Sequence, residues 1–279
     1  MKNLGYYNGQ YDEIENMVIP FDDRSHYYGD GVYDATCARN GVIFNLDEHI
    51  DRFFNSAGLL KIEIPHTKAE IKAILNEMIQ KVDSETNFVY WQVTRATAPR
   101  KHVFPDAKAN FWIMIRPEKI GDYKKLYKLI TVEDTRFLHC NIKTLNLIPN
   151  VMAAQQTKEA GCDECVFHRG ERVTECAHCN ISIIKDGKFI TPPTDHYILP
   201  GIARAHLIKM SKKLGIPVDE TPFTVKELME ADEVVISSSS NFCMQASEVD
   251  GVAVGGKAPE LLKKLQDALL EEYLEATNK

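Results

Sequence analysis

Short β-rich runs alternate with amphipathic helical segments along the whole chain, and this alternation limits the folds that the chain can adopt. The runs 88–94 and 110–115 are rich in β-branched and aromatic residues, which favour strands. Between such runs, apolar residues recur at helical spacing, as in the stripe from Ile50 to Leu60. This mixture predicts an α+β fold in which sheets and helices pack together.

A polar segment that contains Gly121 divides the chain into two parts of unequal length. We expect an N-terminal α/β domain over residues 1–118, a linker over 119–123 and a C-terminal α/β domain over 124–279. A chain of 279 residues is long enough to bury a substantial core in this arrangement.

Local signals predict where several elements begin and turn. Thr67 and Thr224 each stand three residues before a glutamate, the capping-box pattern that starts a helix. Asp186-Gly187 between two β-rich runs predicts a tight hairpin turn, and a second hairpin is expected to turn near residues 169–172. Further helices are expected after a cap at Asn45 and over residues 149–160, 202–214 and 258–276, and further strands over 41–44, 126–132 and 234–236.

Composition excludes several classes of protein. The net charge of −7 leaves no general attraction for nucleic acid or an anionic membrane. No apolar run approaches the roughly 20 residues of a membrane span, and the first residues lack the apolar segment of a signal peptide. Seven cysteines fit reduced thiols better than a disulfide framework. We therefore expect a cytoplasmic protein that binds neither nucleic acid nor membrane.

Three polar features could carry chemistry. Lys143 lies among apolar residues, and a desolvated lysine has a lowered pKa and can bond covalently to carbonyl carbons. Arg100 and His102 point the same way on an extended chain and could grip a carboxylate. The serine-rich turn 237–241 follows a buried strand and could cradle a phosphate. Each feature also has an ordinary interpretation as an exposed lysine, a solvated basic loop or a polar turn.

The cysteines allow two interpretations. Two C-x-x-C pairs, at 162–165 and 176–179, resemble the outline of a zinc ribbon, and they leave a zinc-binding or thiol-redox protein as an alternative. The same spacing fits a hairpin centred between Gly170 and Glu171, which would place Cys165 opposite Cys176. We favour the hairpin, because buried thiols commonly pack as small hydrophobic groups, and we assign no metal-binding residue.

A series of motifs, taken in order along the chain, matches one family. They are Asp30–Tyr33, Glu48–Arg52, Gln92–His102, Ile142–Leu147, Val173–Glu175, Asn180, Lys185–Gly187 and Ile198–Ile202. The chain resembles the fold-type IV pyridoxal-phosphate aminotransferases, and among them the D-amino acid aminotransferases. The resemblance covers nearly the whole chain, and it implies the two-domain fold of this family with pyridoxal 5′-phosphate between the two domains.

The resemblance also implies roles for individual residues. Lys143 would hold the cofactor covalently and move the substrate proton, and Glu175 would face the pyridine nitrogen and keep it protonated. The other implied cofactor contacts are Arg52, Ser239 and the backbone N–H groups of Ile202 and Ala203 at the phosphate, Ser238 near the ring, and Leu199 packed on it.

Substrate recognition is implied at Tyr33, Arg100 and His102, which match the family's trap for the substrate carboxylate. Arg100 and His102 would come from the partner subunit, so the resemblance implies a homodimer. The expected reaction moves an amino group from a D-amino acid such as D-alanine to a 2-oxo acid such as 2-oxoglutarate by a ping-pong mechanism. A branched-chain L-amino acid aminotransferase of the same fold is the alternative, although that group does not carry this Arg-x-His loop.

One stretch departs from the family pattern. Residues 176–179 read Cys-Ala-His-Cys, where the family commonly has glycine and serine. His178 is therefore expected near the cofactor, and the preference for substrate side chains is not fixed by the motifs.

Overall fold

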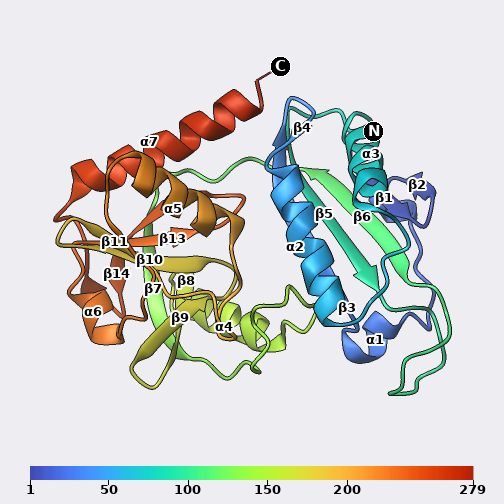
Figure 1. Ribbon diagram of the computed structural model, residues 1–279, viewed down its shortest axis with the longest axis horizontal. Helices are drawn as coiled ribbons and strands as arrows, with labels where there is room; N and C mark the ends of the chain where they lie inside the picture. The colour runs from blue at the N-terminus through green and yellow to red at the C-terminus, as the bar shows by residue number, and fades with distance from the viewer. Residues whose placement is uncertain (279) are drawn as a thin grey trace. The chain divides into compact units, whose positions relative to one another are not determined.

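The computed structural model describes residues 1–278, which divide into two compact units (Figure 1). Unit 1 contains residues 1–120, 142–146 and 273–278, and unit 2 contains residues 121–141 and 147–272. The chain first leaves unit 1 within the predicted linker at 119–123. It then returns to unit 1 twice, at residues 142–146 and from residue 273 onward. The predicted domains were continuous stretches of chain and did not include these returns.

Unit 1 is built on a six-stranded antiparallel sheet in the order β2-β1-β6-β5-β3-β4. The two β-rich runs of the sequence form its neighbouring strands β5 and β6. Strand β3 pairs with β5 along its whole length. It was not predicted from the sequence, because polar residues interrupt its apolar ones. The strands are β1 (Leu4–Tyr7), β2 (Gln10–Asp12), β3 (Gly31–Arg39), β4 (Val42–Ile43), β5 (Thr86–Thr94) and β6 (Asn110–Pro117).

Two amphipathic helices supply much of the core of unit 1. Helix α2 (Leu46–Leu59) and helix α3 (Lys68–Ile79) bury residues such as Phe53 and Leu75 in one cluster with Trp91 of β5. Helix α3 begins at the predicted capping box of Thr67. Asn45 does stand at the start of α2, but in a left-handed conformation in which its side chain does not cap the helix. The 3₁₀ turn η1 (Ile14–Asn16) and the short helix α1 (Arg24–Tyr28) complete the unit.

Unit 2 contains a nine-stranded mixed sheet. Its path runs β12-β11-β10-β13-β14-β7-β8-β9, with β15 paired to β14. The pairs β11–β12, β14–β7 and β7–β8 are parallel. The strands are β7 (Leu126–Glu133), β8 (Glu164–Arg169), β9 (Arg172–Cys176), β10 (Asn180–Lys185), β11 (Lys188–Ile190), β12 (Val218–Asp219), β13 (Glu233–Ser237), β14 (Met244–Val249) and β15 (Val252–Ala253).

Four helices belong wholly or largely to unit 2, and all four were expected from the sequence. They are α4 (Ile148–Glu159), α5 (Ile202–Lys213), α6 (Val225–Met229) and α7 (Pro259–Ala276). Helix α6 begins at the second predicted capping box, at Thr224. The residues of α7 from Tyr273 onward belong to unit 1, where the Tyr273 ring packs on Phe44.

The register observed in the hairpin of β8 and β9 differs from the predicted one at its far end. Near its turn, Arg169 pairs with Arg172 and His168 with Val173, as a hairpin centred between Gly170 and Glu171 requires. A bulge then shifts the register, so Val166 rather than Cys165 lies opposite Cys176. The expected Cys165–Cys176 pairing is therefore wrong by one residue, because a bulge adds a residue to one strand only.

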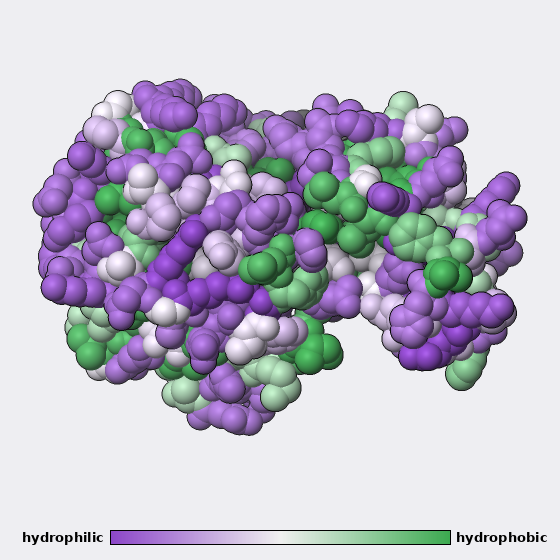
Figure 2. All heavy atoms as spheres, turned by 60° about the horizontal axis from the view of Figure 1, so that its bottom comes forward, coloured by the Kyte–Doolittle hydropathy of each residue, from purple (hydrophilic) through white to green (hydrophobic). Residues whose placement is uncertain are grey.

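The helices of the structure can be compared with the length and apolar character of a membrane span. Within residues 1–278, no helix combines the length and the apolar character that crossing a bilayer requires. Figure 2 shows a largely hydrophilic face with separate apolar areas between the polar ones.

Candidate active site

Lys143 lies in the short segment of unit 1 that interrupts unit 2 in the sequence. The segment runs beside the start of β3, where Tyr33 N–H donates to Lys143 O (2.9 Å) and Thr144 forms a bridge with Val32. Lys143 N–H also donates to Ser56 Oγ of α2 (3.2 Å). The backbone of Lys143 is therefore held between the edge of a sheet strand and a helix.

The side chain of Lys143 lies over an aromatic ring. Its Nζ is 4.4 Å from the centroid of the Tyr33 ring, and that ring stacks on Tyr90 of β5 at a centroid distance of 5.2 Å. Such a position suits a cation, because the ring face is electron-rich. Two of the predicted site residues, Lys143 and Tyr33, are thus in contact.

Arg52 forms a buried cluster with two residues that the sequence analysis did not select. Its Nε and Nη2 donate to the carboxylate of Asp34 at 2.9 and 2.7 Å, and His49 Nδ1 lies 2.7 Å from the same carboxylate. Burial alone would raise the pKa of Asp34, but Arg52 and His49 outweigh it and hold that pKa well below its usual value. Arg52 lies one helical turn before Ser56, so α2 presents it beside the Lys143 segment.

Arg100 and His102 lie together on an exposed loop between β5 and β6. Both contact Tyr28: the Arg100 guanidinium is 5.3 Å and the His102 ring 5.2 Å from the centroid of its ring. Arg24 fixes the loop by donating to Lys101 O (2.6 Å). These contacts join the loop to α1, whereas Tyr33 contacts Lys143 and Tyr90, so unit 1 holds the three predicted substrate residues in two separate groups.

Glu175 is buried at the end of β9 in unit 2, and a network of donors surrounds it. Arg136 Nη1 donates to Oε1 (2.5 Å), while Asn180 Nδ2 and Leu199 N–H donate to Oε2, each at 3.0 Å. Arg136 in turn binds Asp134 through Nε and Nη2, both at 2.9 Å. This network stabilises the ionised carboxylate, and its bond from Leu199 N–H brings two of the predicted cofactor residues together.

The predicted phosphate contacts lie at two elements of unit 2. Ile202 and Ala203 open helix α5, whose N-cap is Gly201, a residue without a side chain to cap the first N–H groups. A Cβ on Gly201 would clash with Asn180 Oδ1, and hydrogen bonds to Glu175 and Leu199 O hold that amide in place, so the site favours glycine. Ser238 and Ser239 form the turn after β13, where Phe242 N–H donates to Ser238 O (2.8 Å).

The model of the amino-transferase class IV family matches residues 31–249. The chain belongs to the class IV aminotransferases. It is 40% identical over 271 residues to the D-alanine aminotransferase of Listeria monocytogenes serotype 4b (strain F2365), covering 95% of this chain and 94% of that protein. The D-alanine aminotransferase of Bacillus licheniformis is 35% identical and covers 98% of each chain.

Solved structures of the family share the fold of this aminotransferase. The branched-chain amino acid aminotransferase of Escherichia coli has a TM-score of 0.90 at 21% identity, covering 100% of this chain and 97% of its own. The branched-chain aminotransferase of Thermoproteus uzoniensis has a TM-score of 0.87 at 23% identity, with 98% and 97% covered. These likenesses confirm the predicted α+β, fold-type IV architecture.

Neither the motifs nor the periodicity of the sequence indicated Asp34, His49 or Arg136. His49 and Arg52 stand three residues apart, a spacing that places both on one face of a helix, and this signal could have found His49. To predict the role of Asp34, one must first recognise strand β3. To predict the role of Arg136, one must know the course of residues 134–140, which form neither helix nor strand. Neither was available from periodicity.

Proposed function

We propose that this aminotransferase transfers the amino group of a D-amino acid such as D-alanine to a 2-oxo acid such as 2-oxoglutarate, with pyridoxal 5′-phosphate as cofactor. The observation that carries the proposal is the 34–40% identity to D-alanine aminotransferases over nearly the full length. The Arg100-x-His102 loop supports the same substrate class, since its two cationic or polar side chains suit a carboxylate.

The residues present fit the cofactor. Bound pyridoxal phosphate supplies an electron sink for charge that develops at the α-carbon of the substrate. Gly201 leaves the first N–H groups of α5 without a side-chain cap, and a helix N-terminus of this kind suits a phosphate. Arg52 carries the opposite charge to the phosphate, and its pairing with Asp34 fixes its orientation.

The mechanism that we propose uses two residues directly. Lys143 Nζ would remove the proton from the α-carbon of the donor amino acid and, in the second half of the reaction, give a proton to the α-carbon of the product amino acid. The packing of the Lys143 backbone on β3 and α2 limits the positions that its side chain can reach. The Glu175 carboxylate would keep a proton on the pyridine nitrogen. Arg136 and Asn180 support that role because they hold the carboxylate oriented by hydrogen bonds.

We also propose that the active form is a homodimer in the cytoplasm. Exposed apolar side chains lie on the segment before α1 and on the loop that carries Arg100 and His102. Phe21 of the segment is 87% exposed, and Val103 of the loop is 71% exposed. Ala98 N–H of the loop donates to Asp22 O (3.0 Å), so these segments are neighbours, and a second copy would cover them. All seven cysteines are free thiols, which suits a reducing compartment.

The alternative function is a branched-chain L-amino acid aminotransferase, which the solved structural neighbours favour by name. A substrate screen distinguishes the two. The purified enzyme, supplied with 2-oxoglutarate, should convert D-alanine and not L-leucine, L-isoleucine or L-valine. Turnover confined to the three L-amino acids would instead establish the alternative.

A second experiment tests Lys143 itself. Borohydride reduction of the yellow protein, followed by peptide mapping, should place the cofactor on the peptide that contains Lys143. Lys143→Ala should lose turnover and the covalent label, whereas Lys188→Ala, at an exposed hairpin position, should keep both. A label on any other lysine would contradict the assignment.

A further inference from the structure

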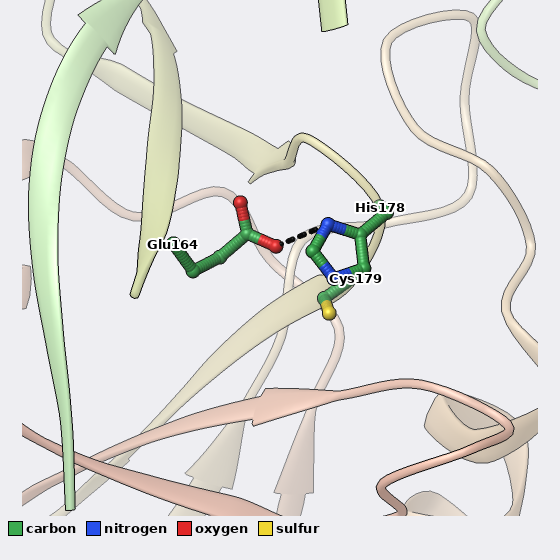
Figure 3. A group of neighbouring side chains, drawn as sticks. All are labelled: Glu164, His178 and Cys179. Carbon is green, nitrogen blue, oxygen red and sulfur yellow. Dashed lines mark ion pairs between the residues drawn. The ribbon is translucent and has the colours of Figure 1, made fainter. Parts of the chain in front are cut away.

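Three side chains of unit 2 with metal-binding atoms converge outside the residues that the proposed reaction uses. Glu164 begins strand β8, and His178 and Cys179 lie in the bend between β9 and β10. One ligand atom of each residue lies within 4.8 Å of those of the other two. Figure 3 shows the carboxylate of Glu164 pointing at the His178 ring, with the thiol of Cys179 next to the same ring.

The side chain of Glu164 is buried and is held in place by backbone hydrogen bonds. Its side chain is 2% exposed, and Oε1 accepts the backbone N–H groups of Cys165 (2.8 Å) and Ala177 (3.3 Å). Oε2 points to the cluster and lies 2.7 Å from His178 Nδ1. Among residues 1–278, however, no donor reaches Oε2 with good hydrogen-bond geometry. A buried carboxylate oxygen is costly unless a cation faces it; protonated His178 can be that cation, and a metal ion held by the same side chains would take the place of its proton.

The other two side chains add complementary properties. His178 is 65% exposed, so its ring can turn without disturbing the core and can admit an ion from solvent. Cys179 is 6% exposed, and it supplies a sulfur at a fixed place. The exposed ring can therefore adjust to the two buried ligands, which stay where the fold holds them.

We propose that Glu164, His178 and Cys179 bind a zinc ion, with water in the fourth position. Thiolate, imidazole and carboxylate are the three ligand types that zinc takes in proteins, at about 2.3, 2.0–2.1 and 2.0–2.2 Å. Three protein ligands leave the coordination position that open zinc sites keep for water. Binding displaces the thiol proton of Cys179 and the proton on the ligating nitrogen of His178, and both protons pass to solvent. The site does not depend on the proposed transamination.

This site differs from the zinc ribbon that the cysteine spacing suggested. The ribbon would use both C-x-x-C pairs, including Cys162. Within residues 1–278, the group of three or more candidate ligands contains Cys179 alone of the four paired cysteines. The two arrangements therefore predict different effects of the same substitutions.

Zinc retention by the purified holoenzyme tests the site. The protein is treated with a chelator, mixed with ZnCl₂ and passed through a gel-filtration column, and bound zinc per chain is measured by mass spectrometry. Wild type and Cys162→Ser should retain one zinc per chain. His178→Ala should bind zinc at least tenfold more weakly, and it should fold because His178 is exposed.

Cobalt tests the ligands themselves. Wild type loaded with Co²⁺ should show the strong visible bands of a tetrahedral thiolate complex, at longer wavelength than the yellow cofactor absorbs. Cys179→Ser should lose the thiolate contribution, and Cys162→Ser should keep it. The proposal fails if wild type retains no zinc, if His178→Ala binds zinc as wild type does, or if Cys162→Ser loses the metal.

Discussion

Asp34 and Arg52 are buried opposite charges, so each is stable in the fold only while the other is present. Removing one partner of a buried pair typically costs about 3–5 kcal/mol, because it leaves an uncompensated charge. Asp34→Asn should therefore lower the free energy of unfolding by about this amount in a urea titration. Asp51→Asn on the same helix is the matched control, since its ion pair with Lys68 is exposed and is worth about 1 kcal/mol or less. Equal losses in the two variants would contradict the buried-pair argument.

The same carboxylate predicts the direction of an acid effect. The pKa of Asp34 lies below that of an unfolded carboxyl, which is about 3.9. The unfolded chain therefore binds the proton first, so the stabilisation is present above about pH 4 and is lost as the pH falls toward the folded pKa. The difference in unfolding free energy between wild type and Asp34→Asn, measured from pH 7 to pH 3, should shrink below about pH 4. A constant difference would mean that Asp34 is not the titrating group.

Arg100 gives a kinetic prediction. If it pairs with the substrate carboxylate, Arg100→Ala should cost about 2–5 kcal/mol in kcat/KM for D-alanine. Lys101→Ala, the neighbouring exposed position, should change kcat/KM little. Steady-state kinetics of both variants make the comparison, and unchanged kinetics for Arg100→Ala would show that the loop does not reach the substrate.

At the scale of elements, two glycines should respond oppositely to the same substitution. Gly187, in the turn between β10 and β11, has φ +72°, and Gly58 lies inside α2; a Cβ at either would meet open space. Gly187→Ala should destabilise by about 1–2 kcal/mol because of its left-handed conformation. Gly58→Ala should stabilise by about 0.5–1 kcal/mol. Thermal melts compare them, and shifts of the same sign would refute the conformational explanation.

Elements with local signals could be predicted, and those set by distant partners could not. The capping boxes at Thr67 and Thr224 and the Asp186-Gly187 turn act over a few residues, so the sequence reveals them. Strand β3 is stabilised by pairing with β5 and by the contact of Asp34 with α2, and neither partner is near it in sequence. The bulge in the β8–β9 hairpin likewise depends on packing. The site follows the same rule: family motifs indicated Lys143 and Glu175, but not the Arg136 that orients Glu175.

At the scale of the whole molecule, the proposed homodimer can be tested by mixing two impaired variants. Arg100→Ala leaves its own Lys143 intact, and Lys143→Ala leaves its own Arg100 intact. If the loop serves the partner's site, subunit exchange should create one complete site per mixed dimer, and roughly a quarter of wild-type activity should return for free exchange. Light scattering should give twice the chain mass of 31.7 kDa. No recovery in a sample that exchanges subunits would mean that the loop acts within its own chain.

The two returns of the chain to unit 1 have a consequence for its synthesis. Unit 1 starts with the first residues to leave the ribosome, but it also needs Ile142 in its core and the packing of Tyr273 on Phe44. Domains usually fold as units, the N-terminal one first, while translation proceeds. All six strands of the unit 1 sheet are translated by Pro117, but the packing of Tyr273 on Phe44 cannot form until all of unit 2 has been translated. Unit 1 therefore has its sheet early but keeps one side of Phe44 uncovered while unit 2 is translated, and its last packing step waits for the end of the chain.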